Sequence, residues 1–133
     1  MIKLIVGRKG SGKTKQLIDL MNEAVAKEHG SIVCVEKGAK LTYDISHAIR
    51  LVDVEHYNIV GYEAFYGFIA GILAGNYDIT DLFIDSILKI GSKDLNDLGA
   101  FLEAISLIKE NVNVVLTVSA DVSELPDSVK KFM

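Results

Sequence analysis

Short apolar runs alternate with amphipathic segments along the whole chain. The apolar runs have the length of strands and end at glycine, polar or acidic residues; they occupy residues 2–6, 31–36, 81–85 and 112–118. Between them lie segments whose apolar residues share one helix face; these cover residues 14–29, 62–74 and 94–109. Because alternating strands and helices build a parallel sheet covered on both faces, the pattern predicts an α/β fold, a three-layer αβα sandwich with a mostly parallel sheet of about five strands.

Two weaker segments and a stripe of glycines complete the pattern. Residues 44–50 are predicted to form a short helix, and residues 58–60 a short strand. Along the apolar 62–74 helix and at its end, glycine recurs every four residues, at Gly67, Gly71 and Gly75. We expect this stripe to pack closely on the sheet, since the helix is too short to span a bilayer. The alternative is a partner surface formed by the aromatic residues Tyr62, Phe65, Tyr66 and Phe68.

The loop after the first apolar run carries a phosphate-binding pattern. Residues 7–14 read G-x-x-x-x-G-K-T, the Walker A pattern, and stand between a predicted strand and a predicted helix, as that motif requires. In such a loop backbone N–H groups cradle phosphate oxygens, Lys13 reaches the β- and γ-phosphates, and the Thr14 hydroxyl ligates Mg²⁺. The sequence therefore predicts a site for ATP or another nucleoside triphosphate with Mg²⁺. Its residues are Gly7, Arg8, Lys9, Gly10, Ser11, Gly12, Lys13 and Thr14.

An acidic residue ends the third apolar run. Asp85 follows three large apolar residues, as in a Walker B strand, where the aspartate holds Mg²⁺. A helix cap or turn residue is the alternative. The next residue, Ser86, stands where many P-loop ATPases have the glutamate that activates the attacking water. Glu36, at the end of the strand after the P-loop helix, is the best substitute, and a solvated acid is the alternative to that role.

Further polar candidates lie on the last strand and among the arginines. Thr117 and Ser119 share one face of the last predicted strand, whose end often carries a γ-phosphate sensor in P-loop proteins with an additional strand. We expect Ser119 to be the sensor because it is nearer the end; a simple strand-end hydroxyl is the alternative. Of the two arginines, Arg8 lies in the loop, and Arg50 is expected to form a surface salt bridge rather than to contact phosphate. Nucleotide kinases usually close a lid that carries several arginines over the transferred phosphate, and two arginines are too few for such a lid.

Composition narrows the class further. The 133 residues suffice for one domain, 1–133, with a substantial core. The net charge of −4 argues against broad nucleic-acid binding. Cys34 lies within an apolar run and is expected to be a buried hydrophobe, and the histidines show no zinc-ligand spacing. The longest nearly unbroken apolar stretch, 64–75, is too short to cross a bilayer, and no secretory signal is visible. We expect a soluble, cytoplasmic protein with no membrane span.

These motifs resemble those of the P-loop NTPase superfamily. Because Asp85 comes well after the second strand, the resemblance is to the recombinase-like branch with an additional strand. A looser resemblance, to the thymidine kinase type, covers residues 7–18, 36–40, the strand before Asp85, and 118–121 with Pro126 beyond. The chain departs from that type at Ser86, where the family has glutamate, and it lacks the cysteine-bearing zinc segment. The whole chain also resembles short ATP-binding proteins of Firmicute bacteria.

Three functions remain open on this basis. The first is an ATP–Mg-binding protein with slow or partner-stimulated hydrolysis, in which Lys13, Glu36 and Ser119 act on the nucleotide. The second is a nucleotide-switched binding or regulatory module without turnover. The third is a degenerate nucleoside kinase of the thymidine kinase type. A homo-oligomer or a protein partner is also expected, because a chain without its own arginine finger can borrow one from a neighbour.

Overall fold

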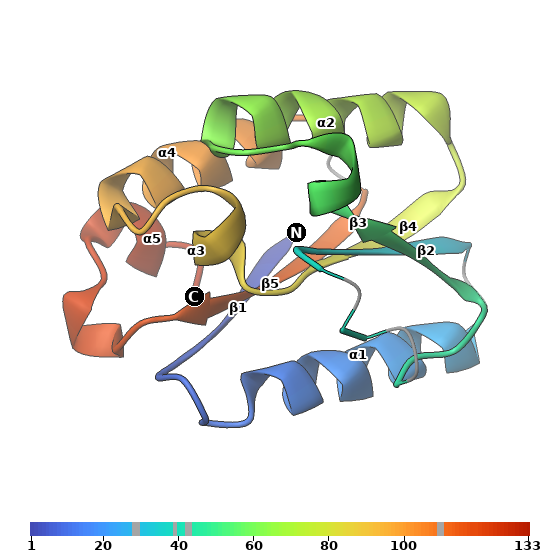
Figure 1. Cartoon of the computed structure of the whole chain (residues 1–133), viewed down its shortest axis with the longest axis horizontal. Helices are drawn as coiled ribbons and strands as arrows, with labels where there is room; N and C mark the ends of the chain where they lie inside the picture. Colours follow the sequence, from blue (N-terminus) through green and yellow to red (C-terminus); the bar gives the residue numbers. More distant parts are fainter. Residues whose placement is uncertain (28–29, 39, 42–43, 109–110) are drawn as a thin grey trace.

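A parallel sheet of five strands forms the centre of the molecule (Figure 1). The structure is a computed structural model that describes residues 1–27, 30–38, 40–41, 44–108 and 111–133. The strand order is β1-β5-β4-β2-β3, and every neighbouring pair is parallel. The strands are β1 (Ile2–Gly7), β2 (Ser31–Glu36), β3 (Ile49–Asp53), β4 (Ile79–Ile84) and β5 (Asn113–Ser119). Strand β5 therefore lies between β1 and β4.

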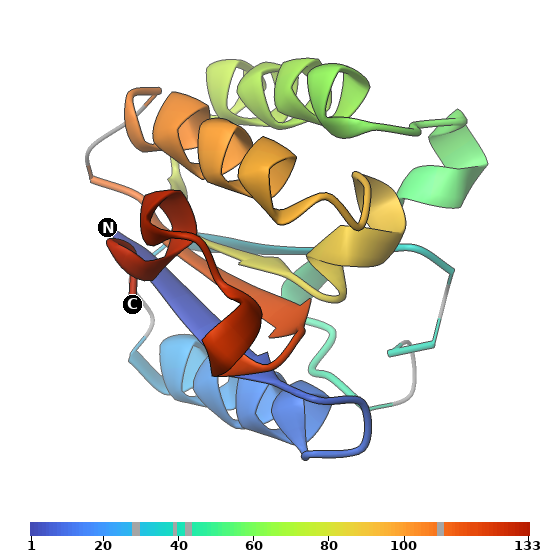
Figure 2. The ribbon, with the colours of Figure 1, turned by 90° about the vertical axis from the view of Figure 1, so that its left-hand side faces the viewer.

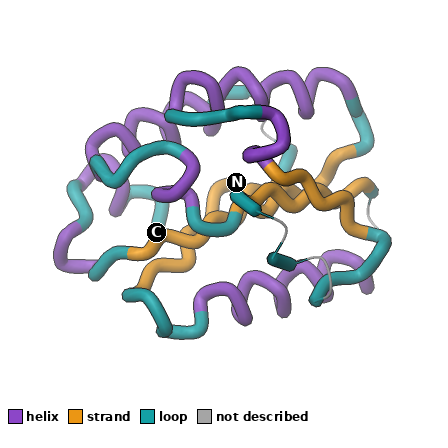
Figure 3. Tube along the Cα trace, viewed as in Figure 1, coloured by secondary structure: helices purple, strands orange, loops and turns teal. Residues whose placement is uncertain are grey.

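Helices cover both faces of the sheet, which gives three layers (Figure 2). One face carries α1, and the other carries α2 and α4, with α3 and α5 at its margins (Figure 3). The helices are α1 (Lys13–Lys27), α2 (Tyr62–Gly75), α3 (Ile87–Ile90), α4 (Leu95–Ser106) and α5 (Asp127–Lys130), with short 3-10 helices η1 (Val54–Tyr57) and η2 (Val122–Glu124). The predicted fold class is confirmed.

Two hydrophobic clusters, one on each face of the sheet, hold these layers together. Side chains alternate between the faces along each strand, so that every strand contributes to both clusters. Beneath α1, the fully buried Leu17 and Met21 pack among residues that include Ile5, Cys34 and Phe83. The larger cluster on the other face includes Val33, Phe65, Leu82, Leu98, Leu102 and Leu116. Cys34 is buried and free, as expected.

The segment between β2 and α2 differs from its prediction. No helix forms within described residues 44–50; the Ser46 hydroxyl oxygen accepts the Ala48 N–H in a turn, and strand β3 begins at Ile49. Residues 58–60 are not a strand, because the Asp53 carboxylate starts η1 by accepting the Glu55 N–H and left-handed Asn58, with φ of 56°, ends it. Pairing with β2 and a side-chain cap, which periodicity does not report, decide the local structure here.

The glycine stripe on α2 also differs from its prediction. Gly67, Gly71 and Gly75 are exposed, and a Cβ at any of them would meet nothing within 4 Å. Close packing on the sheet is therefore not their role. The aromatic alternative fails in part as well, since Phe65 is fully buried and stacks on Phe101, with ring centroids 5.5 Å apart. Tyr66 does remain exposed on α2.

Gly71→Ala is expected to raise the free energy of unfolding by about 0.5–1 kcal/mol, because an exposed helical glycine costs backbone entropy and no neighbour obstructs the methyl group. Gly99→Ala on α4 serves as the contrast. Its Cβ would collide with the side chain of Ser128, so a loss of about 1–3 kcal/mol is expected. Urea unfolding of both variants measures the two effects. A destabilised Gly71→Ala protein would show that this face of α2 is already covered.

Candidate functional site

The carboxyl ends of all five strands lie along one edge of the sheet, because every strand is parallel. Strand pairing places Gly7 opposite Ser119, and Glu36 opposite Asp53. Asp85 follows β4 directly, and its N–H donates to the Val35 carbonyl oxygen at 3.0 Å. Predicted site residues from distant parts of the chain therefore meet at this edge, where open α/β sheets bind their ligands.

The Walker A loop connects β1 to α1 through a glycine-dependent turn. Gly10 and Gly12 both have φ near +85°, a left-handed conformation that other residues adopt only with strain. A Cβ on Gly7 would meet the Ser11 hydroxyl, which would have to turn away to make room for it. The Ser11 N–H donates to the Arg8 carbonyl at 3.1 Å and closes the turn. Gly12, which the motif demands, is therefore also a glycine that this backbone needs.

Lys13, the first residue of α1, is the cationic centre of the loop. Only 7% of Lys13 is exposed, and its ammonium donates to the Arg8 carbonyl oxygen at 2.9 Å. The N-terminus of α1, which has a favourable dipole for anions, opens at the same point. The cation and the helix end thus act on the same space, which can accept a phosphate chain.

A hydrogen-bonded group joins the loop to strands β4 and β5. The Thr117 hydroxyl donates to Asp85 Oδ1 at 2.7 Å, and the Ser86 N–H donates to Thr117 Oγ1 at 2.6 Å. The Thr14 hydroxyl lies 3.5 Å from the same Asp85 oxygen. Thr14 and Asp85, which are 71 residues apart in sequence, therefore face each other, as the two predicted Mg²⁺ ligands must.

The chemistry of these donors fits Mg²⁺. The ion prefers oxygen ligands and is commonly held by one or two carboxylates together with substrate phosphates and waters. Thr14 supplies a hydroxyl oxygen and Asp85 a carboxylate oxygen at the mouth of the loop. Among the described residues no group of three or more His, Cys, Asp and Glu side chains could hold a metal by itself. Any ion at Thr14 and Asp85 would thus depend on phosphate oxygens.

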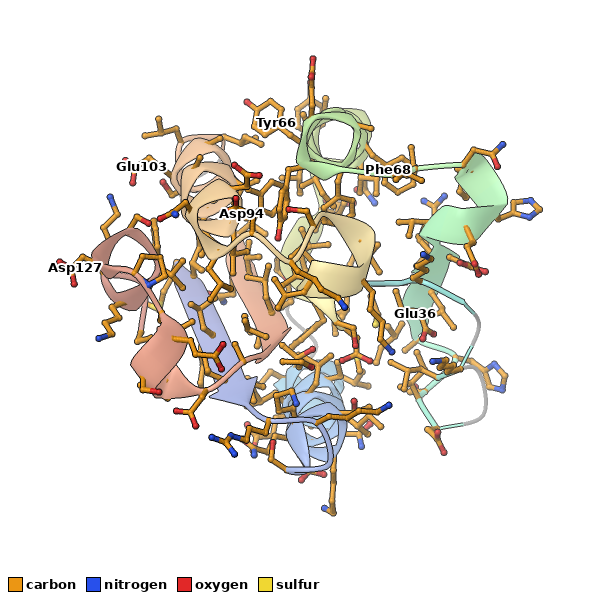
Figure 4. The ribbon with its side chains drawn as sticks, turned by 60° about the vertical axis from the view of Figure 1, so that its left-hand side comes forward. Glu36, Tyr66, Phe68, Asp94, Glu103 and Asp127 are labelled. Carbon is orange, nitrogen blue, oxygen red and sulfur yellow. The ribbon has the colours of Figure 1, made fainter. Side chains whose placement is uncertain are left out.

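Glu36 has a structural partner in the loop that follows β2. Only 2% of this residue is exposed, and its Oε2 accepts the Leu41 N–H at 3.0 Å (Figure 4). On the neighbouring strand, the Asp53 carboxylate accepts the Gly38 N–H at 2.8 Å. Burial raises the pKa of Glu36, and the nearby Asp85 and Asp53 carboxylates raise it further, against the lowering effect of the backbone N–H groups. The solvated-acid alternative is therefore wrong for Glu36.

The remaining predicted residues divide between the cleft and the surface. Ser119 lines the cleft and is exposed, whereas Thr117 is buried and bonded to Asp85. Arg8 points away from the loop and pairs with Asp121, at 2.8 Å. Arg50 is exposed on β3 and forms no ion pair with another described residue, so its expected salt bridge is not found.

A cleft of about 870 Å³ opens above the Walker A loop. The loop and the start of α1 form one wall, the segment after β4 forms another, and the end of β5 contributes Thr117 and Ser119. Although the chain has a net charge of −4, lysines dominate the charged lining. They are Lys9, Lys13, Lys15, Lys89 and Lys93.

Sequence reasoning missed two contributions to this cleft. It preferred Ser119 to Thr117, although strand alternation alone gives both the same face; burial beside Asp85 distinguishes them. It also passed over Lys89 and Lys93, which belong to no motif. Their only signal in the sequence is that they closely follow Asp85, at the edge of the sheet where ligands bind.

A comparison with solved structures shows that the fold is not unique to this chain. It is similar to the flagellar accessory protein FlaH from Methanocaldococcus jannaschii, with 19% sequence identity and a TM-score of 0.60. The match covers 98% of this chain and 65% of FlaH, so this chain spans about two thirds of the length of that protein. No family model and no curated protein matches the chain. The likeness shows a shared fold and carries no statement about activity.

Helix length bears on the expectation that the chain has no membrane span. Within the described residues, no helix is both long enough and apolar enough to cross a bilayer.

Glu36→Gln is expected to remove a pH dependence of stability. The fold raises the pKa of Glu36 above its ordinary value of 4.5, so the folded protein favours the protonated acid. The protonated acid therefore adds to the free energy of unfolding in full below pH 4.5. This contribution is lost as the pH rises through the pKa of Glu36 in the folded protein. The wild-type free energy of unfolding should therefore decline over this interval relative to the variant, whose amide oxygen still accepts the Leu41 N–H. Urea titrations of both proteins at several pH values measure this difference in the free energy of unfolding.

Glu23→Gln, which changes an exposed carboxylate on α1, is the matched control. Its curve should run parallel to that of the wild type. If the Glu36→Gln curve also ran parallel, the fold would not perturb this acid.

Proposed function

We propose that the chain is an ATP–Mg-binding P-loop protein, or one that binds another nucleoside triphosphate, with slow or partner-stimulated hydrolysis. The observation that carries the proposal is the approach of Thr14 to Asp85 across the mouth of a complete Walker A loop. A loop that bound phosphate alone would not need a carboxylate there, because a carboxylate repels phosphate unless a cation lies between them. Mg²⁺ is the cation that the oxygen donors suit.

Each part of the site has a role in this proposal. Backbone N–H groups of residues 8–13 and the start of α1 hold the phosphate oxygens. On binding, Lys13 exchanges the Arg8 carbonyl for phosphate oxygens. Thr14 and Asp85 hold Mg²⁺, which supplies charge neutralisation to the phosphates when it is bound. Thr117 orients the Asp85 carboxylate through its hydrogen bond.

Slow hydrolysis follows from the groups that would activate water. Ser86 carries no carboxylate, and its N–H is already bonded to Thr117. Glu36 is buried, and one of its oxygens is bonded to the Leu41 N–H, so it must leave that bond or use its other oxygen to orient a water. Neither arginine faces the cleft. A partner that repositions the loop after β2 or supplies a cation would accelerate turnover.

One observation favours a second function, a nucleotide-switched module without turnover. The chain of hydrogen bonds from Ser86 through Thr117 to Asp85 links the magnesium site to the start of α3. A ligand that moves Asp85 therefore changes the support of α3. Such coupling suits a protein that reports nucleotide occupancy to a partner.

Lys13→Ala is expected to weaken the binding of MgATP by about 10- to 100-fold, which is the usual value of a charge-assisted hydrogen bond. Asp85→Asn should instead lower the gain in affinity that Mg²⁺ provides, with a smaller effect on ATP measured with a chelator. Calorimetric titration of each variant, with and without Mg²⁺, measures both effects. Lys130→Ala on α5 is the control for loss of a surface cation outside the cleft. Equal affinity in wild type and Lys13→Ala would contradict the proposal.

Phosphate release from ATP by the purified protein tests the activity itself. We expect turnover well below the typical enzyme value of about 10 s⁻¹. Glu36→Gln should reduce it further if that acid positions the water, and an unchanged rate would remove Glu36 from the mechanism. A panel of nucleosides added to the same reaction detects phosphoryl transfer to an acceptor, which would favour the kinase alternative. Tight binding with no release of phosphate would favour the switched module.

A further inference from the structure

Several lysines of the cleft have no acidic partner. In the part of the chain that the structure describes, the ion pairs join Arg8 to Asp121, Lys15 to Asp19 and Lys131 to Glu103. The cleft lysines that form none of these pairs are Lys9, Lys13, Lys89 and Lys93. Among the described residues, the lining has one carboxylate, Glu124, and Asp85 acts on Lys89 from nearby, so cations outnumber acids at this cleft although the whole chain is acidic. A local excess of cations in an acidic protein suits a site for a polyanion.

Two lysines of this region approach each other closely. Lys89 on α3 lies near Lys40 from the loop after β2, and the Lys40 ammonium lowers the pKa of Lys89. Partial desolvation and Lys9 lower this pKa further, whereas the Asp85 carboxylate raises it. Two neighbouring ammonium groups repel each other, so the approach of Lys40 to Lys89 is unfavourable until an anion lies between them. The anion would have to reach the cleft, because Lys89 is part of its lining.

The backbone that carries Lys89 is firmly placed. Ile87 and Ile90 on α3 are buried in the core, and the Lys89 N–H donates to the Ser86 carbonyl oxygen at 3.0 Å. The Ser86 N–H is in turn bonded to Thr117. The exposed side chain of Lys89 is therefore held on the wall that faces Lys13 and the Walker A loop, only four residues from Asp85.

The position of Lys40 depends on the end of β2. The Leu41 N–H next to it donates to the buried Glu36 carboxylate, and the Gly38 N–H donates to Asp53. These bonds bring the loop back toward the sheet edge and set Lys40 beside Lys89. The hydrogen bond from the Leu41 N–H to Glu36 therefore positions Lys40 as well as the loop that carries it.

We propose that Lys89, with Lys40 beside it, contacts the terminal phosphate of a bound nucleoside triphosphate and makes the site prefer triphosphate to diphosphate. The inference rests on the proposed nucleotide binding. The backbone N–H groups of the loop hold the α- and β-phosphates, and Lys13 reaches the β- and terminal phosphates from one side. The terminal phosphate projects toward the wall formed after β4, where Lys89 is the cation nearest in sequence to Asp85. Lys89 then supplies the positive charge at the terminal phosphate, which neither arginine of the chain supplies because neither lines the cleft.

Calorimetric titration with MgATP and with MgADP tests this selection in wild type, Lys89→Gln, Lys40→Gln and the control Lys130→Gln. For Lys89→Gln we expect a loss of about tenfold or more in affinity for MgATP and less than about twofold for MgADP, since one charge-assisted contact is removed from the terminal phosphate alone. Lys40→Gln should also lose more affinity for MgATP than for MgADP, but its loss should be smaller than that of Lys89→Gln. Lys89→Arg should retain selection for triphosphate, and Lys130→Gln should change neither affinity.

The outcomes separate this inference from the proposed function. If the wild type binds MgATP, Lys13→Ala weakens that binding, and Lys89→Gln keeps the wild-type ratio of the two affinities, then the selection by Lys89 is overturned while nucleotide binding stands. An equal loss for both nucleotides overturns it in the same way, because it would indicate general electrostatic attraction. If the wild type binds neither nucleotide, both proposals fail.

Discussion

The position of β5 between β1 and β4 is the constraint on which the site depends. Parallel pairing on both sides sets the register of three strands at once, so the loop after β1, the acid after β4 and the hydroxyls of β5 end at one edge. Thr117 shows the consequence directly, since it reaches Asp85 across 32 residues of sequence at 2.7 Å. Changing the order of these strands would separate the Walker A loop from its acidic partner without altering any residue of either.

Packing of α1 fixes the other half of the site. This helix carries the phosphate loop at its start, and its buried Leu17 and Met21 hold it against the sheet. Burial of each such side chain contributes about 1.5–3 kcal/mol, so the helix end is held by the core. Preorganised donors lose little free energy on binding an anion, because they need no rearrangement. The hydrophobic cluster beneath α1 would therefore support the phosphate binding that we propose, although none of its members lines the cleft.

The sequence predicted the parts of this structure that depend on local chemistry. Strand β2, the Walker A loop, the long helices and the approach of Thr14 to Asp85 follow from periodicity and a motif with fixed geometry. Strand β3 was not predicted, because its formation depends on pairing with β2. The contact of Glu36 with the Leu41 N–H and the exposure of the α2 glycines depend on tertiary placement, which one-dimensional patterns do not contain. Lys89 and Lys93 were overlooked as parts of the cleft for the same reason.

The backbone at Ser86 has a consequence for any substitution at this position. Its φ of 58° and ψ of 57° place it in the left-handed region, which costs a residue with a Cβ about 1–2 kcal/mol. Glutamate would bear the same strain as the serine does, and the left-handed backbone would set the direction in which its carboxylate leaves the chain. The identity of the residue after Asp85 is therefore only one half of what a water-activating acid would need here, and the shape of the turn after β4 is the other half.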